Sequence, residues 1–120
     1  MRSVILISPS DNEISCLFKQ WEGNAQNMFM DGDKLNMVIN KERIYIDYIE
    51  NGRNDYDEEE INHINIGKLS FYSICYSDRE IMKLFIQKSV FSQGSYIDND
   101  FGRVVLVEEL RKEEILNFIA

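Results

Sequence analysis

Apolar side chains recur at every second position in two neighbouring stretches, and this period restricts the fold more than any other feature of the chain. They are Leu35, Met37 and Ile39, followed after a polar break by Ile44, Ile46 and Tyr48. A period of two places alternate side chains on one face of a β-strand, where they can pack in a core. The break at Asn40-Lys41-Glu42 has the length and composition of a turn. Residues 35–39 and 43–50 are therefore predicted to be adjacent strands of a β-meander.

Two other segments have the period of an α-helix. In the first, apolar residues recur at intervals of three and four: Ile14, Leu17, Phe18 and Trp21. Ser10 and Glu13 precede this stripe with the spacing of a capping box, and Gly23-Asn24 ends it. In the second, Ser77 and Glu80 have the same spacing before Ile81, Leu84 and Phe85, and Gln93-Gly94 is predicted to end the helix.

The remaining segments complete an α+β pattern. Short strands are predicted at residues 4–7, 28–30, 69–76, 96–98 and 104–107, a short helix through Ile61 and Ile64, and a last helix at 108–119. The meander is predicted to end at Asn51-Gly52, because an Asn-Gly pair is suited to positive φ. Strands and helices neither alternate strictly nor separate, so we expect one domain, residues 1–120, with a mixed or largely antiparallel sheet and two to four helices packed on it.

Composition and cysteine usage indicate a soluble protein of the cytoplasm. No stretch approaches the roughly 20 apolar residues of a membrane span. The apolar run at residues 4–7 is followed by Pro9 and acidic residues, so it is predicted to be a strand and not a signal peptide. Cys16 and Cys75 lie in unlike contexts and are predicted to be two reduced, mostly buried thiols.

The net charge of −8 is concentrated in one segment. Residues 47–60 contain seven acidic residues and one basic residue, Arg53, a net charge of −6, whereas the remainder of the chain carries only −2. A nucleic-acid binder needs a cationic stripe, which the sequence lacks. We therefore expect no nucleic-acid partner, and the charge distribution favours a basic protein as the partner.

The acidic segment has two interpretations. It is either a solvated loop that keeps the protein soluble or a recognition surface, and the tyrosines among the acids favour the second, because tyrosine offers a large contact area at low entropic cost. Tyr48 is expected to face the core. The predicted partner-binding residues are Tyr45, Asp47, Glu50, Asp55, Tyr56, Asp57, Glu58, Glu59 and Glu60.

No catalytic or metal-binding set is predicted. The single histidine, His63, has no local signature of a nucleophile's base, and a pair with Cys16 or Cys75 is the only such arrangement left open. Asp31-Gly32-Asp33 and Asp98-Asn99-Asp100 resemble the openings of calcium loops, but the later ligand positions are apolar or glycine. We therefore predict turns at both places, no cofactor and no enzymatic activity.

The C-terminal half resembles a group of small bacterial immunity-type proteins, which typically sit beside secreted polymorphic or contact-dependent toxins. The similarity lies in Tyr72-Ser73-Ile74-Cys75-Tyr76-Ser77-Asp78, a following helix, and Tyr96-Ile97-Asp98-Asn99-Asp100-Phe101-Gly102. It implies a non-enzymatic inhibitor of a toxin domain, often a nuclease, with Asp98 and Asp100 shaping a turn. Two alternatives remain: a small metal-dependent enzyme that uses Asp31, Asp33, Asp98 and Asp100, and a structural or adaptor subunit.

Overall fold

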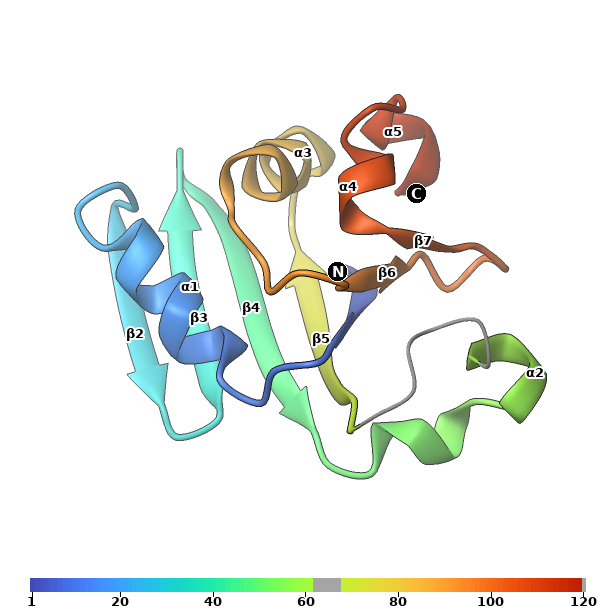
Figure 1. The fold of residues 1–120 in the computed structure, drawn as a ribbon. Helices are drawn as coiled ribbons and strands as arrows, with labels where there is room; N and C mark the ends of the chain where they lie inside the picture. Colours follow the sequence, from blue (N-terminus) through green and yellow to red (C-terminus); the bar gives the residue numbers. More distant parts are fainter. Residues whose placement is uncertain (62–67, 120) are drawn as a thin grey trace.

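The computed structural model describes residues 1–61 and 68–119, apart from the side chain of Glu60, and contains one seven-stranded sheet (Figure 1). The strand order is β2-β3-β4-β5-β1-β6-β7, and every neighbouring pair is antiparallel. The strands are β1 (Arg2–Ser8), β2 (Asn27–Asp31), β3 (Lys34–Ile39), β4 (Glu42–Ile49), β5 (Ser70–Tyr76), β6 (Tyr96–Asp98) and β7 (Val104–Leu106). The predicted α+β class and largely antiparallel sheet are confirmed.

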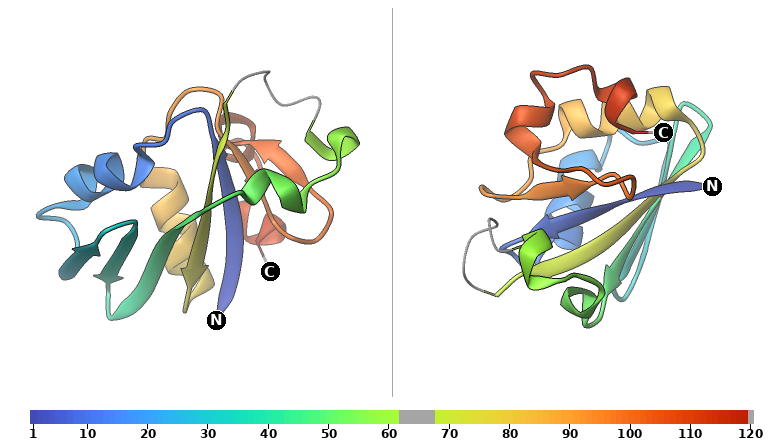
Figure 2. Two further views of the ribbon diagram at one scale, coloured as in Figure 1. Left: turned by 90° about the horizontal axis from the view of Figure 1, so that it is seen from below. Right: turned by 90° about the vertical axis from the view of Figure 1, so that its right-hand side faces the viewer.

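Four helices cover one face of the sheet: α1 (Glu13–Trp21), α3 (Arg79–Lys88), α4 (Val107–Leu110) and α5 (Ile115–Phe118) (Figures 1 and 2). Most of the alternating apolar residues of β3 and β4 are buried in this layer, as their period predicts, and Leu35, Ile44 and Ile46 are completely buried. Tyr48, expected to face the core, is instead 37% exposed at the end of β4, with its ring edge-on to that of Tyr72. From the helix side, Trp21 of α1 stacks on Phe85 of α3 with ring centroids 5.6 Å apart. Burial on this face accounts for most of the core.

The opposite face of the sheet carries only a smaller cluster. Its buried members are Ile7, Ile61 and Phe71, and the segment that follows β4 covers them. That segment contains the 3₁₀-helix η1 (Gly52–Asp55) and the short helix α2 (Glu58–Ile61) (Figure 2). Among the described residues, no helix lies on the rest of this face, over β2 and β3.

Both tight turns of the meander contain residues with positive φ. Gly32 has φ +60° between β2 and β3, and Asn40 and Lys41 have φ 50° and 69° between β3 and β4. Two consecutive residues with positive φ twist a two-residue hairpin in the same sense as its strands. The predicted turns of the meander are confirmed, and β3 pairs with β2 and β4 across them.

Neither predicted capping box forms. The α1 helix begins at Glu13, whose buried carboxylate accepts hydrogen bonds from Ser8 Oγ at 2.7 Å and the Ser92 backbone N–H at 2.9 Å. At α3 the N-cap is Asp78, which accepts from the Ile81 N–H at 3.0 Å, and Ser77 instead bonds to the start of β4. Glu13 and Ser77 bond to other parts of the chain instead of to their own helices, and Ser10 Oγ accepts from the Asn12 N–H at 3.1 Å, before α1 begins.

The C-terminal helix predicted at residues 108–119 is wrong: the chain forms α4 and α5 instead. Leu110 and Ile119 are both buried, although they would point in opposite directions on one helix at about 100° per residue. The break between the two short helices brings both side chains into the core.

The α3 helix ends at Lys88, before the predicted end at Gln93-Gly94. Ser89, the residue after it, accepts a hydrogen bond from the Trp21 indole N–H at 2.9 Å and has an extended backbone, which prevents another helical turn.

The two cysteine thiols are both free. Cys16 is exposed and not buried as expected, whereas Cys75 is half-buried.

The short helix predicted to open at the acidic run begins in α2, where Ile61 is buried. The parts of that prediction that involve Ile64, and the interpretation of His63, lie outside the described residues. Within residues 1–61 and 68–119, none of the helices has both the length and the apolar surface needed to cross a membrane.

Candidate partner-binding surface

The predicted binding residues divide between β4 and the segment that follows it. Tyr45 and Asp47 lie on the helix-free face of the sheet, where both side chains are half-buried. In the register of the sheet, Tyr45 stands between Asn36 and Cys75. The Tyr45 hydroxyl accepts a hydrogen bond from Arg43 Nη1 at 3.1 Å. These two side chains are therefore available to a partner that approaches the bare face.

The η1 segment is fixed to the sheet by its fit against Phe71. Asn51 takes the left-handed conformation, φ 58°, and turns the chain back over the sheet. Gly52 then passes so close to Phe71 that a Cβ atom at this position would lie 2.5 Å from Phe71 Cβ. The Asn-Gly pair was predicted for its positive φ, but only Asn51 adopts one; the glycine is required for space.

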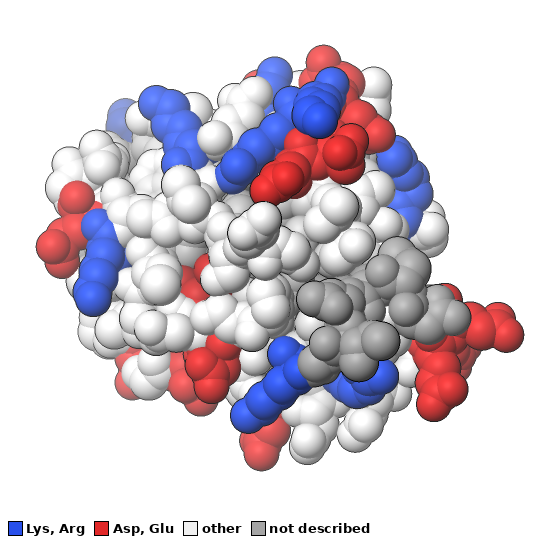
Figure 3. All heavy atoms as spheres, viewed as in Figure 1, with Lys and Arg blue, Asp and Glu red and all other residues white. Residues whose placement is uncertain are grey.

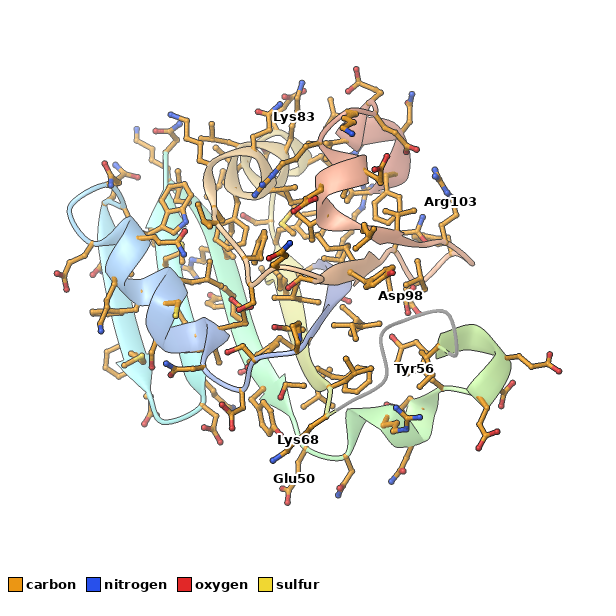
Figure 4. All side chains as sticks on the ribbon, in the orientation of Figure 1. Glu50, Tyr56, Lys68, Lys83, Asp98 and Arg103 are labelled. Atoms are coloured by element: carbon orange, nitrogen blue, oxygen red, sulfur yellow. The ribbon has the colours of Figure 1, made fainter. Side chains whose placement is uncertain are left out.

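Tyr56 provides the second attachment of this segment. Its ring stacks on Phe71, with centroids 5.4 Å apart and an interplanar angle of 27°. Its hydroxyl donates a hydrogen bond of 2.6 Å to Asp98 Oδ2 at the end of β6, and the two side chains point toward each other in Figure 4. Tyr56 therefore holds the segment in place, a different role from the open contact that the sequence predicted.

The acidic side chains of the segment point outward from this anchored backbone. Glu50, Asp55, Asp57, Glu58 and Glu59 are all exposed. Figure 3 shows a group of acidic atoms that projects at the end of the molecule where Figure 1 places α2. The exposed Arg53 on η1 offsets part of this charge. We refer to Asp47, Glu50, Asp55, Asp57, Glu58 and Glu59 together as the acidic surface.

A pocket of about 330 Å³ opens between η1 and the β6–β7 turn. Three of its lining residues are acidic, and the described part of the lining contains no lysine or arginine. The others are mainly apolar or aromatic, so the pocket combines carboxylates with hydrophobic walls. Its lining comprises Ile5, Ile49, Gly52, Asp55, Tyr56, Phe71, Asp98 and Asp100.

The β6–β7 turn that supplies Asp98 and Asp100 is held by its own hydrogen bonds. Asp98 Oδ1 accepts from the Asp100 N–H at 2.8 Å, and Asn99 Oδ1 accepts from the N–H groups of Phe101 at 2.9 Å and Arg103 at 3.1 Å. Asn99 Nδ2 also donates to the Phe118 carbonyl at 2.9 Å, which joins the turn to α5. Asp98 and Asp100 shape this turn and also line the pocket.

Sequence reasoning did not associate Asp98 and Asp100 with the acidic segment. They are far from it along the chain, and they become its neighbours only because β6 is added beside β1 at the far side of the sheet. No periodicity or local motif encodes that strand order.

The two pairs of aspartates considered for a metal-dependent enzyme belong to opposite edges of the sheet. Asp31 and Asp33 are exposed at the β2–β3 turn, whereas Asp98 and Asp100 belong to the β6–β7 turn. Among the residues that the structure describes, no three His, Cys, Asp or Glu side chains are arranged to hold a metal ion.

Comparisons of the chain with protein-family models, with curated proteins and with solved structures each return no match.

Proposed function

We propose that this chain is an immunity protein of the bacterial cytoplasm that binds and neutralises a cognate toxin domain. The observation that carries the proposal is the anchored acidic surface beside a carboxylate-lined pocket. The partner surface it suits is rich in lysine and arginine, as in a nuclease domain that binds phosphates. The resemblance of the C-terminal half to immunity-type proteins supports the same role.

The pocket has the chemistry needed for one basic side chain. Lysine and arginine have long aliphatic stems that pack on apolar surface while the charged group remains near polar atoms. Ile49 and Phe71 would contact the stem, and the carboxylates of Asp55 and Asp100 would receive the cation. Charge-assisted hydrogen bonds of this kind are stronger than neutral ones.

The remainder of the acidic surface would act mainly on the rate of association. Exposed charges at the rim of an interface steer an oppositely charged partner, and salt screens them within about 10 Å at 0.1 M. Tyr45, on the bare face of the sheet, would add contact area at low entropic cost. Anchoring through Tyr56 and Phe71 lowers the entropy lost when the segment binds, because its backbone is already ordered.

Co-expression and binding measurements test the proposal directly. The reading frames beside the gene are searched for a toxin domain, which is then expressed alone and together with this chain, and survival and the binding kinetics of the purified pair are measured. We expect survival only with the chain present. The variant E58K/E59K should lower the association rate by about tenfold at low salt, and the difference should shrink as salt rises.

A charge-matched variant separates the surface from net charge. Glu22 and Glu108 are exposed and lie outside the acidic surface, so E22K/E108K changes the net charge by the same amount. Its association rate should stay near that of the wild type. Equal loss in both variants would contradict the acidic surface as the binding site, and failure of the chain to bind or rescue would contradict the immunity role itself.

A further inference from the structure

The pocket between η1 and the β6–β7 turn presents two carboxylates that face solvent. Asp55 comes from η1 and Asp100 from the turn, and both side chains are exposed. Among the contacts of the described residues, no hydrogen bond or ion pair reaches either carboxylate. The third acid of the lining, Asp98, is already engaged, because its two oxygens accept hydrogen bonds from the Tyr56 hydroxyl and the Asp100 N–H. Two carboxylates from separate elements are therefore left for a ligand.

The pocket has room for more than a single ion. Its volume of about 330 Å³ lies at the lower end of the range of ligand pockets, roughly 300–1,000 Å³. Three residues of the sheet, Ile5, Ile49 and Phe71, form an apolar wall. The Tyr56 ring, stacked on Phe71, adds a second aromatic group to it. A ligand that fits this pocket has a cationic group for the carboxylates and an apolar stem for the wall.

Arginine suits this arrangement better than lysine. Its guanidinium group is planar and has five N–H donors in a fixed fork, so it can bond to carboxylates on two sides at once. The ammonium group of lysine is a compact, strongly hydrated point charge, so it loses more when it enters a pocket with apolar walls. A guanidinium group also stacks on aromatic rings, which Tyr56 and Phe71 supply here.

We propose that this pocket is a guanidinium site that receives an arginine side chain of the toxin domain. The assignment of the arginine to a toxin rests on the proposed function, whereas the preference for guanidinium follows from the lining of the pocket. The bond between Tyr56 and Asp98 joins the two sides of the pocket, so Asp55 and Asp100 are held in relation to each other before the arginine arrives. Such preorganisation lowers the cost of binding.

Binding of blocked amino acids to the full chain tests the site without the toxin. N-acetyl-arginine amide and N-acetyl-lysine amide carry the same single charge and resemble side chains within a protein. NMR spectra of the ¹⁵N-labelled chain are recorded as each compound is added at constant ionic strength. We expect the backbone signals of Gly52, Tyr56 and Asp100 to shift saturably with the arginine compound, with a Kd of about 1–10 mM. The lysine compound should bind at least about threefold more weakly.

Two double variants show whether the carboxylates of the pocket hold the cation. Asp55→Asn/Asp100→Asn should weaken binding of the arginine compound by about tenfold or more, because it neutralises both available carboxylates. Asp11→Asn/Glu22→Gln removes the same charge from exposed positions near α1 and should leave the affinity unchanged. Circular dichroism confirms that each variant is folded.

Free arginine distinguishes a protein side chain from a small molecule as the occupant. Its own carboxylate is repelled by the acids of the pocket, so it should bind more weakly than the blocked compound. Tighter binding of free arginine would overturn the assignment to a protein side chain. No saturable shift, equal affinity for the arginine and lysine compounds, or binding that survives Asp55→Asn/Asp100→Asn would overturn the guanidinium site. A chain that binds the arginine compound but rescues no cells contradicts the immunity role alone.

Discussion

The hydroxyl of Tyr56 lies 2.6 Å from Asp98 Oδ2 and joins two parts of the chain that are 42 residues apart. The bond links the segment after β4 to the end of β6, so the acidic surface and the β6–β7 turn keep a fixed relation. The stacking of Tyr56 on Phe71 places the hydroxyl where Asp98 can accept its hydrogen bond. The geometry of the pocket between them depends on this pair.

Removal of the Tyr56 hydroxyl should destabilise the fold measurably. Tyr56→Phe keeps the stacked ring but takes a donor from the half-buried Asp98, and we expect a loss of about 1–2 kcal/mol in the free energy of unfolding. Urea denaturation measures it. Tyr45→Phe is the control, because the Tyr45 hydroxyl bonds only to exposed Arg43 in the described contacts, and its loss should cost less than about 0.5 kcal/mol. Equal losses would mean that the Tyr56–Asp98 bond has no special role.

Gly52 should tolerate no side chain. In Gly52→Ala the new Cβ would lie 2.5 Å from Phe71 Cβ, so either the strand or η1 must move. Overpacking of this kind costs about 1–3 kcal/mol. Asn51→Gly is an informative comparison, because Asn51 already has φ 58° and glycine adopts this conformation without strain. Thermal unfolding should show a lower Tm for Gly52→Ala and little change for Asn51→Gly; a Gly52→Ala variant with the Tm of the wild type would contradict the requirement for space.

Glu13 should be more important for stability than its single carboxylate suggests. It is 1% exposed and accepts hydrogen bonds from Ser8 Oγ and the Ser92 N–H, which joins β1, α1 and the chain after α3. Glu13→Ala leaves both donors unsatisfied, and we expect a loss of about 2–4 kcal/mol. Glu13→Gln keeps an acceptor oxygen and should lose less. Denaturant midpoints that fall equally in the two variants would contradict this account.

Periodicity was enough to predict the fold class, the hairpins and the apolar stripes of α1 and α3. Leu35, Met37, Ile44 and Ile46 are buried as their alternation predicts. Such patterns are local, and so are the turn preferences that fix the register of β2, β3 and β4. The helix starts were predicted less well. Glu13 accepts hydrogen bonds from Ser8 Oγ and from the Ser92 N–H instead of capping its own helix, and Ser92 is distant in the sequence.

The candidate site was only half predictable from sequence. The density of acidic residues after β4 is visible in the chain, and their exposure follows from their charge. The pocket is different, because it requires the strand order that brings Asp98 and Asp100 beside Asp55. The anchoring role of Tyr56 was also not evident, since a tyrosine among acids suggests an open contact until its partners Phe71 and Asp98 are known.

Two buried tyrosines should make the protein sensitive to alkali. Burial raises the pKa of Tyr72 and of Tyr76 above the ordinary value of 10.0. Below that value both folded and unfolded chains hold these protons, so they contribute no pH dependence. Above it the unfolded chain releases protons that the folded chain retains, so the free energy of unfolding should fall as pH rises. Urea denaturation on both sides of pH 10.0 tests this. Tyr72→Phe should have a shallower alkaline decline than Tyr45→Phe, and identical slopes would contradict it.

The pocket carboxylates should contribute more to toxin affinity than equal charges elsewhere. Asp55→Asn/Asp100→Asn neutralises two groups that line the pocket, and asparagine suits position 100 because Asp100 has φ 64°. If a basic side chain enters between them, affinity should fall by about tenfold or more, mostly through faster dissociation, because the cation loses close partners. Asp11→Asn/Glu22→Gln removes the same charge from exposed positions near α1 and should leave dissociation unchanged. Surface plasmon resonance at two salt concentrations separates the effects: a contact in the pocket changes the dissociation rate at both, whereas a purely long-range effect changes only association and disappears at high salt.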